Sequence, residues 1–219
     1  MGTPLFDNET PPALPKDVLG AGTAVLAGFA LDRKDELLVS LKLVVGQSPF
    51  RNMITPGGFR MSVAMSNCGP FGWVTDRTGY RYSRIDPETN RAWPEMPQVF
   101  RKLAESAAHE AGFPNFVPDA CVINRYEPGT KLSLHQDKDE HDFAQPIVSV
   151  SLGLPATFLF GGLDRGAKVV RITLVHGDVV VWGEPARLRY HGVAPLGEGV
   201  HPRLGRVRYN LTFRKAGLA

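Results

Sequence analysis

The sequence has few cysteines and no long apolar run. Its 219 residues include only Cys68 and Cys121, which lie far apart and are expected to be two reduced thiols rather than a disulfide. No stretch reaches the run of about 20 apolar residues that a membrane-spanning helix needs. The first 20 residues are acidic and proline-rich, without the basic start and apolar centre of a secretory signal. These absences predict a cytoplasmic chain with no membrane partner.

Neither sign of charge is in large excess. The net charge is +3, with 43% hydrophobic and 21% charged residues, which is the composition of a globular protein. A mildly basic chain permits a polyanionic partner without requiring one. No internal repeat or low-complexity segment is present, and the length suits one substantial domain. We expect the chain to be a monomer.

The pattern of the chain changes near residue 118. We expect an N-terminal tail over 1–20, a helical and β-hairpin region over 21–117, a β core over 118–214 and a short tail over 215–219. All of these would form one integrated domain. The core consists of short apolar runs separated by Gly, Pro and Asp, a spacing typical of an antiparallel sandwich or barrel.

The N-terminal half is expected to contain two helices. The first spans 32–47, with apolar residues at helical spacing and Asp32 as its N-cap. The second spans 96–113, with Pro97 in its first turn and Gly112 just past its end. Between the helices, 55–69 predicts a turn followed by a strand. The aromatic and arginine-rich segment 76–93 predicts a hairpin and loop.

A His-x-Asp pair opens the β core. In an extended strand, residues two apart point the same way, so His135, Asp137 and Asp139 would face one side. Such a pair is common on solvated surfaces, but with a second histidine it forms the facial triad of non-haem Fe(II) oxygenases.

Three histidines are candidates for the remaining ligand. His141 is so near that the chain would have to fold back, and His176 precedes a turn, where histidines are usually exposed. We prefer His191, because it arrives on its own predicted strand, with His176 as the second choice.

The last strand carries polar residues on one face. Arg208, Asn210, Thr212 and Arg214 alternate with Tyr209, Leu211 and Phe213. This face is either the solvated side of an edge strand or a pocket for a dianion, since guanidinium groups bind carboxylates in bidentate fashion. Asn124 and Tyr126 also alternate and can belong to the same pocket.

Together these segments resemble a known family. "NRYEPGTKLSLHQDKDE", "VSVSLGLPATFLFGG", "GDVVVWGEPARLRYHGV" and "RYNLTFR" resemble the AlkB family of Fe(II)- and 2-oxoglutarate-dependent nucleic-acid demethylases. "TPGGFRMSVAMSNCGPFGW" and "DRTGYRYS" extend the likeness to about residues 50–214. The resemblance implies a mainly β fold with flanking helices. Its core would be a double-stranded β-helix (jelly roll), and the N-terminal half would form a nucleotide-recognition lid.

The resemblance also implies site residues. The catalytic iron ligands would be His135, Asp137 and His191. The 2-oxoglutarate residues would be Asn124, Tyr126, Arg208, Asn210 and Arg214, with Arg208 on the remote carboxylate and Arg214 nearer the metal. The substrate residues would be Thr55, Met61, Trp73, Tyr80, Arg81, Tyr82, Asp139 and Arg165.

The implied reaction is oxidative demethylation of N-alkylated bases in DNA and, by extension, RNA. It uses Fe(II), O2 and 2-oxoglutarate and releases formaldehyde, succinate and CO2. N1-methyladenine and N3-methylcytosine are cationic, so Asp139 could meet their charge, or could instead hold a ligand histidine.

Trp73, Tyr80 and Tyr82 would stack on an unstacked base, with His191 on the far side, while Arg81 and Arg165 contact phosphates. Trp182 is assigned to the core. The alternative is an Fe(II)/2-oxoglutarate hydroxylase of a small molecule or protein side chain, which the aromatic and arginine-rich lid disfavours. A non-catalytic nucleic-acid binder is a third reading.

Overall fold

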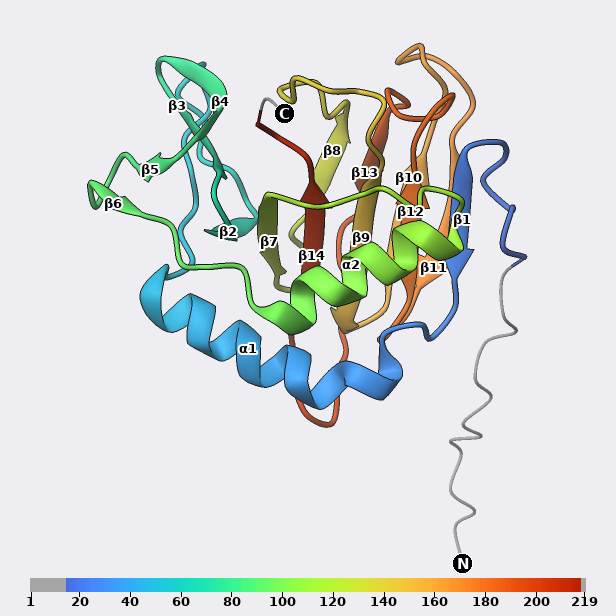
Figure 1. Ribbon diagram of the computed structural model, residues 1–219, viewed down its shortest axis with the longest axis horizontal. Helices are drawn as coiled ribbons and strands as arrows, with labels where there is room; N and C mark the ends of the chain where they lie inside the picture. The colour runs from blue at the N-terminus through green and yellow to red at the C-terminus, as the bar shows by residue number, and fades with distance from the viewer. Residues whose placement is uncertain (1–14, 218–219) are drawn as a thin grey trace, which may run out of the picture.

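Two β-sheets face each other in the structure, a computed structural model that describes residues 15–217 (Figure 1). The predicted tails at 1–20 and 215–219 therefore lie partly outside the described residues. The larger sheet has the order β1-β12-β9-β14-β7-β2 and the smaller one β11-β10-β13-β8. This arrangement is the predicted jelly roll, and the chain is mainly β with two flanking helices.

The strands of the larger sheet come from both halves of the chain. They are β1 (Thr23–Leu26), β2 (Ala64–Cys68), β7 (Ala120–Tyr126), β9 (Ile147–Gly153), β12 (Val179–Trp182) and β14 (Arg208–Arg214). Because β1 and β2 pair with β12 and β7, the N-terminal region is built into the same sheet as the core.

The smaller sheet and two hairpins complete the β structure. The strands of the smaller sheet are β8 (Leu132–His135), β10 (Ala156–Phe160), β11 (Val170–Leu174) and β13 (His191–Val193). The hairpins are formed by β3 (Gly72–Asp76) with β4 (Gly79–Ser83) and by β5 (Ile85–Asp86) with β6 (Arg91–Ala92). The segment 76–93, predicted to form a hairpin and loop, contains β4 and the β5–β6 hairpin, whereas β3 lies almost wholly before it.

Strand β14 divides its side chains between two environments. It lies between β7 and β9 and pairs with both along its length. Leu211 and Phe213 point to the helices and join the main hydrophobic core, where Phe213 meets Phe100 edge-on with ring centroids 6.1 Å apart. Since strand side chains alternate, Arg208 and Arg214 point the other way, into the space between the sheets. They are buried, which excludes the solvated-edge reading of this strand.

Both helices cover the outer face of the larger sheet (Figure 1). Helix α2 (Gln98–Glu110) buries an apolar stripe consisting of Phe100, Leu103, Ala104, Ala107 and Ala108. It is shorter than the predicted 96–113, because Pro97 is the N-cap, with an extended ψ of 143°, rather than a residue of the first turn. Gly112 follows the helix with φ +92°, as its place after the helix end requires.

The first helix begins later than predicted. Helix α1 spans Lys34–Gln47, and a 3₁₀ turn, η1 (Leu31–Arg33), precedes it. The predicted N-cap, Asp32, is wrong, because the 3₁₀ turn moves the cap position to Arg33 and no side chain caps the helix.

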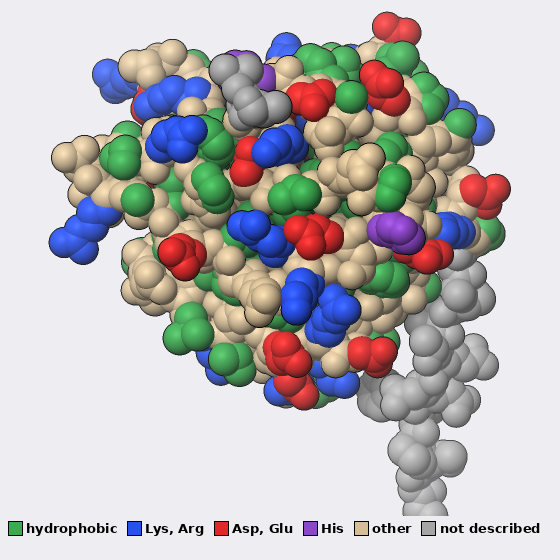
Figure 2. Space-filling view, in the orientation of Figure 1, with side chains coloured by type: hydrophobic (Ala, Val, Ile, Leu, Met, Phe, Trp, Pro, Cys, Tyr) green, Lys and Arg blue, Asp and Glu red, His purple; other side chains and the backbone are tan. Residues whose placement is uncertain are grey.

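Acidic and basic side chains are interspersed on the face that α1 and α2 cover (Figure 2). That face therefore presents no large area of a single charge. Among the described residues, no helix is long and apolar enough to cross a membrane.

Candidate active site

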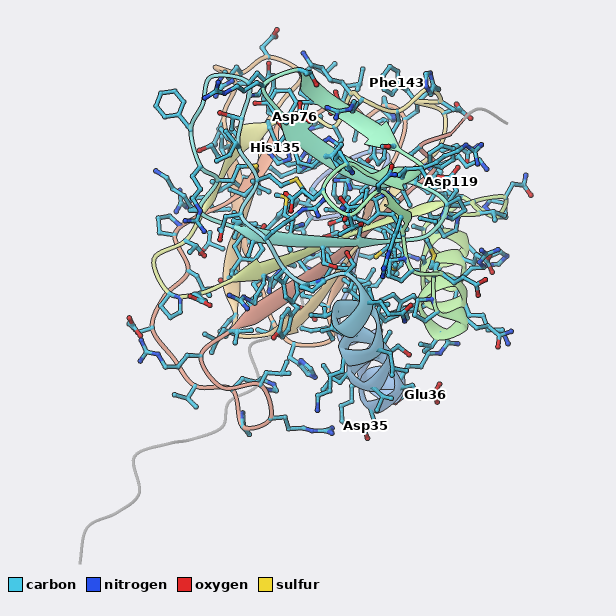
Figure 3. The ribbon with its side chains drawn as sticks, turned by 90° about the vertical axis from the view of Figure 1, so that its left-hand side faces the viewer. Asp35, Glu36, Asp76, Asp119, His135 and Phe143 are labelled. Carbon is cyan, nitrogen blue, oxygen red and sulfur yellow. The ribbon has the colours of Figure 1, made fainter. Side chains whose placement is uncertain are left out.

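Two histidines and one aspartate meet where the smaller sheet ends. His135 is the last residue of β8 and His191 the first of β13, and the two lie directly opposite each other in the antiparallel pair. His135 lies with Asp76 at one end of the molecule, and Asp35 and Glu36 of α1 lie at the other (Figure 3). Asp137 follows β8 by two residues. Its carboxylate oxygens lie 3.5 Å from Nε2 of His135 and 3.7 Å from Nε2 of His191.

Backbone carbonyls orient both imidazoles. Nδ1 of His135 lies 2.9 Å from the oxygen of Ser133, and Nδ1 of His191 lies 3.1 Å from that of Arg189. A carbonyl only accepts, so Nδ1 carries the proton and the lone pair of Nε2 faces Asp137. The three side chains offer ligand atoms within 4.8 Å of one another, which suits one shared metal ion.

The charges of the cluster favour metal ligation. Burial opposes ionisation of Asp137, but Arg214 and the two histidines hold the pKa of its carboxyl well below the usual 3.8. Burial, together with the neighbouring His135, lowers the pKa of His191 to about 3. The carboxylate is thus charged and His191 is neutral at pH 7, which are the forms that bind a metal.

A narrow cavity of about 30 Å³ continues from the cluster between the sheets. Its lining includes all five residues assigned to 2-oxoglutarate, namely Asn124, Tyr126, Arg208, Asn210 and Arg214. Four buried polar atoms in its wall have no hydrogen-bond partner among the described residues. They are Asn124 Oδ1, Tyr126 hydroxyl, Trp182 Nε1 and Arg208 Nε. Buried polar groups normally have hydrogen-bond partners, so these atoms suit a polar ligand in the cavity.

Arg208 has the surroundings of an anion-binding residue. It is 1% exposed, and its guanidinium donates to the hydroxyl of Ser151 at 2.8 Å. Burial lowers its pKa to about 10, so it remains charged at neutral pH without a carboxylate partner. The donor set of Arg208 and Tyr126 fits the remote carboxylate of 2-oxoglutarate. Arg214 lies nearer the metal cluster, with Nε 2.8 Å from Oδ2 of Asp137.

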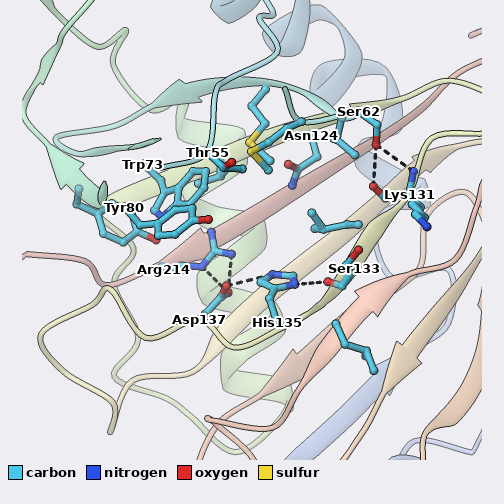
Figure 4. Close-up of a pocket in the computed structure, with 17 residues that line it drawn as sticks. Thr55, Ser62, Trp73, Tyr80, Asn124, Lys131, Ser133, His135, Asp137 and Arg214 are labelled. Carbon is cyan, nitrogen blue, oxygen red and sulfur yellow. Dashed lines mark hydrogen bonds and ion pairs between the residues drawn. The ribbon is translucent and has the colours of Figure 1, made fainter. Parts of the chain in front are cut away.

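A wider cavity of about 360 Å³ opens over the metal cluster (Figure 4). Five predicted substrate residues line it, namely Thr55, Met61, Trp73, Tyr80 and Tyr82. Trp73 and Tyr80, from the two strands of the hairpin, stack with centroids 5.7 Å apart and an interplanar angle of 19°. The cavity therefore joins flat aromatic side chains to the candidate metal ligands.

The opposite wall of this cavity differs from the prediction. His135 lines it, whereas His191 lines the narrow cavity and is 5% exposed. His135, from the edge strand β8, is therefore the histidine that faces the wide cavity, and His191 lies on β13, the next strand of the same sheet.

Asp139 has a role that neither predicted alternative described. Strand β8 ends at His135, and Asp139 lies beyond it, outside any strand. Oδ2 of Asp139 instead accepts a hydrogen bond from Nε1 of Trp73 at 2.8 Å. Asp139 thus orients the indole of the wide cavity.

Two arginines that were predicted to contact phosphates do not line either cavity. Arg81 forms an ion pair with Asp76 within the hairpin, and Arg165 lies over the ring of Tyr190. Neither is among the lining residues, so their contacts with phosphate stay predictions.

The other candidate ligands and Trp182 are also placed. His141 is exposed, and His176 packs against His201, with ring centroids 4.6 Å apart. Neither belongs to the cluster. Trp182 is buried as predicted, and its ring lies 4.9 Å from that of His191.

Sequence reasoning missed two buried residues beside the metal cluster. Glu140 and Arg187 form an ion pair of 3.0 Å, with side chains 2% and 4% exposed. Glu140 lies among several other acids after β8, and acidic side chains are usually solvated. The two residues lie 47 positions apart, and no local pattern links them.

Comparisons with known proteins agree with this geometry. The family model described as "2OG-Fe(II) oxygenase superfamily" matches residues 22–214. "Alpha-ketoglutarate-dependent dioxygenase AlkB" of Escherichia coli is 59% identical over 202 residues, covering 92% of this chain and 94% of that protein. Its counterpart in Salmonella typhimurium is 56% identical and covers 97% of both chains. The solved structure described as "The structure of OsALKBH1" has a TM-score of 0.77 and 30% identity, and covers 89% of this chain and 96% of that one.

Proposed function

The chain belongs to the 2OG-Fe(II) oxygenase superfamily, and from this membership we propose that it demethylates N-alkylated bases of nucleic acids. The AlkB relatives support a dioxygenase that uses Fe(II), O2 and 2-oxoglutarate. The observation that carries the proposal is the aromatic-lined cavity, which opens directly onto His135 and Asp137, two of the three candidate metal ligands.

The metal would be held by Nε2 of the two histidines and the carboxylate of Asp137. When bound with 2-oxoglutarate and O2, it supplies the oxidation of the N-methyl group, which leaves as formaldehyde while the co-substrate becomes succinate and CO2. The backbone carbonyls of Ser133 and Arg189 keep Nε2 of each histidine unprotonated for this role.

The co-substrate would lie in the narrow cavity. Arg208 and the hydroxyl of Tyr126 offer donors to its remote carboxylate, and Asn124 and Asn210 line the path toward the metal. Arg214 lies at the end of the cavity nearer the metal cluster. Its guanidinium contacts Asp137 and would also attract the carboxylate of 2-oxoglutarate that is nearer the metal.

The substrate base would enter the wide cavity after leaving its stack, which costs a few kcal/mol and less in a single strand or at a lesion that blocks pairing. The aromatic rings of Trp73 and Tyr80 cover one face, and His135 lies on the other side. Asp139 holds Trp73 in place and puts a carboxylate beside the ring, which suits a cationic base.

N1-methyladenine and N3-methylcytosine are the proposed lesions because both bases are cationic. The proposed setting is the cytoplasm, and the proposed substrates are single- or double-stranded DNA and also RNA, bound by a monomer. Light scattering of the purified chain with and without a methylated oligonucleotide tests the monomer.

The deciding experiment measures formaldehyde and succinate over a panel of modified oligonucleotides, with product mass read directly. We expect both products in equal amounts from the methylated strands and neither from unmodified ones. Succinate from a small molecule or a peptide, without formaldehyde from any oligonucleotide, would favour the hydroxylase instead.

A further inference from the structure

A buried carboxylate lies beside the metal cluster without belonging to it. The side chain of Glu140 is 2% exposed. Its Oε1 accepts a hydrogen bond from the hydroxyl of Tyr82 at 2.7 Å and lies 3.3 Å from Nε of Arg214. Its Oε2 accepts from Nη2 of Arg187 at 3.0 Å. One carboxylate thus joins groups from β4, from β14 and from the segment before β13.

The two arginines that Glu140 binds are the ones that hold Asp137. Nε of Arg214 donates to the side chain of Asp137 at 2.8 Å. Nη1 of Arg187 donates to its backbone oxygen, also at 2.8 Å. Nε of Arg187 also donates to the backbone oxygen of Gln145 at 3.0 Å, which ties the segment after the metal ligand to the same group. Glu140 therefore orients both groups that position the carboxylate ligand.

The network of Glu140 also reaches the β3–β4 hairpin, which carries Trp73, Tyr80 and Tyr82. Among residues 15–217, strand β4 pairs with β3 alone, in a sheet separate from the sandwich. Two side-chain hydrogen bonds join this hairpin to the segment after β8, one from Trp73 to Asp139 and one from Tyr82 to Glu140. Burial, with the nearby acids, raises the pKa of the Tyr82 hydroxyl well above 10, so the phenol stays protonated and donates.

A continuous path thus connects the hairpin to the metal ligand. It runs from the Tyr82 hydroxyl to Oε1 of Glu140, then to Nε of Arg214, and ends at Oδ2 of Asp137. Both Tyr82 and Arg214 use the same oxygen of Glu140. Displacement of the hairpin would therefore change the contacts of Arg214, and through them the hold on Asp137.

We propose that Glu140 is a positioning residue that couples the seating of the β3–β4 hairpin over the wide cavity to the placement of Asp137 for metal binding. The inference rests on the proposed function, in which this hairpin covers the substrate base. Because coupling is reciprocal, metal binding stabilises the seated hairpin, and a seated hairpin strengthens metal binding. A substrate base that stabilises the seated hairpin would thereby favour the placement of Asp137 for metal binding.

The first test measures the affinity of the full chain for Mn(II), used as a redox-inert probe, without any substrate. Tyr82→Phe removes only the hydroxyl that reaches Glu140, and we expect it to weaken Mn(II) binding at least about fivefold. Tyr80→Phe is the matched control. It removes a hydroxyl from the same strand that makes no hydrogen bond with any described residue, so Mn(II) affinity should stay at the wild-type value.

The second test follows hydrogen exchange of the β4 amides with and without Mn(II). In the wild type, Mn(II) should slow this exchange. Glu140→Gln keeps the volume but removes the charge that binds both arginines, so the Mn(II)-dependent slowing should disappear while the β9 and β14 amides remain protected.

The proposal is overturned if Tyr82→Phe binds Mn(II) as tightly as Tyr80→Phe does, or if Mn(II) protects β4 in Glu140→Gln as it does in the wild type. If Glu140→Gln fails to fold, the two tyrosine variants decide alone. Neither readout needs turnover. A failure of the proposed function, seen as no formaldehyde from any methylated strand, is therefore distinguishable from a failure of the coupling.

Discussion

Asp137 is both a candidate metal ligand and the partner of a neighbouring cation, Arg214. Its carboxylate faces two imidazoles and also accepts from Arg214. Asp137→Ala should abolish turnover, with a loss beyond the roughly 10–100-fold that removal of an outer-shell partner causes. The fold should survive, because Arg214 keeps Glu140 as its acidic neighbour. A formaldehyde assay beside a thermal melt checks both parts, and substantial residual turnover would contradict the ligand assignment.

Arg208 is assigned to the remote carboxylate because it is buried and charged, and its Nε has no hydrogen-bond partner in the described part of the chain. Truncating one member of a buried charge pair costs about 2–5 kcal/mol, which corresponds to roughly 30-fold or more in affinity. Arg208→Ala should therefore raise the KM for 2-oxoglutarate by at least that factor.

Initial rates over a range of 2-oxoglutarate concentrations measure this KM. Arg206→Ala is the control, because Arg206 forms an exposed ion pair with Glu198 and is not among the lining residues of either cavity. An unchanged requirement in Arg208→Ala would place the anchor elsewhere.

Trp73 combines a stacking face with a hydrogen bond to Asp139. Base stacking on an aromatic side chain contributes about 1–3 kcal/mol, so Trp73→Ala should weaken binding of a methylated oligonucleotide by about 5–150-fold. Mn(II) binding should be spared, because Trp73 is not a ligand. Trp73→Phe keeps a ring without the indole N–H and should lose less. Equal losses in the two variants would show that stacking is not the source of the effect.

At the residue scale, spacing marked candidate residues for part of the site, and the family resemblance chose among their alternatives. His-x-Asp and the alternating polar face of β14 are local patterns, so His135, Asp137, Arg208 and Arg214 were within reach of sequence reasoning. Choosing His191 among three histidines needed only its place on a predicted strand. The ion pair of Glu140 with Arg187 could not be predicted from local sequence, because the sequence does not show whether a charged residue is solvated or buried.

At the scale of elements, the close approach of β13 to β8 brings the two histidines together. Gly192 permits this approach, since a Cβ built there would lie 2.6 Å from the backbone oxygen of Leu132. The neighbouring atoms are backbone and cannot rotate away. Gly192→Ala should therefore push the strands apart, separate His191 from His135 and weaken Mn(II) binding by about 10-fold or more.

Gly197→Ala is the control for this substitution, because nothing lies within 4 Å of a Cβ at that position. It should bind Mn(II) with wild-type affinity. Calorimetric titration of both variants gives the comparison. A wild-type affinity in Gly192→Ala would mean that the strands tolerate the methyl group without moving the ligands.

Elements were predictable where their periodicity was long and unbroken. Helix α2 carries an apolar stripe over its whole length, and only its ends differ from prediction. The start of α1 was missed because a 3₁₀ turn and a helix share local spacing over a few residues. The segment from His135 to Asp139 was treated as one extended strand, but β8 ends at His135, and the segment after it is contacted by distant residues such as Arg187.

At the scale of the whole molecule, a pair of histidines links stability to pH. His176 accepts a hydrogen bond at Nδ1 from the amide of Gly153 and packs against His201. Burial, then His201, Lys34 and Arg203, lower the pKa of His176, with Asp178 opposing them. Burial and Arg203 also lower the pKa of His201.

The sign of the pH effect follows from these lowered pKa values. The unfolded chain takes up protons on both imidazoles near pH 6.5, whereas the folded chain does so only at lower pH. Unfolding therefore takes up protons, and its free energy should fall as the pH drops below about 6.5. Each histidine contributes at most about 1.4 kcal/mol per pH unit.

Urea unfolding at about pH 7.5 and about pH 5.5 measures this loss of stability. His176→Asn keeps an acceptor for the amide of Gly153 but cannot titrate, so the loss between the two pH values should be smaller in this variant. An equal loss in wild type and variant would assign the pH dependence to other groups.

The direct pairing of His135 with His191 also bears on how such proteins change over evolution. Their position depends on the register of two neighbouring strands and not on the number of residues between them. Insertions or deletions in loops away from this pair would leave the two imidazoles facing each other. In a divergent homologue in which the number of residues between the two histidines differs, the ligands can be located from the structure. One lies at the end of the edge strand that corresponds to β8, and the other lies directly opposite on the neighbouring strand.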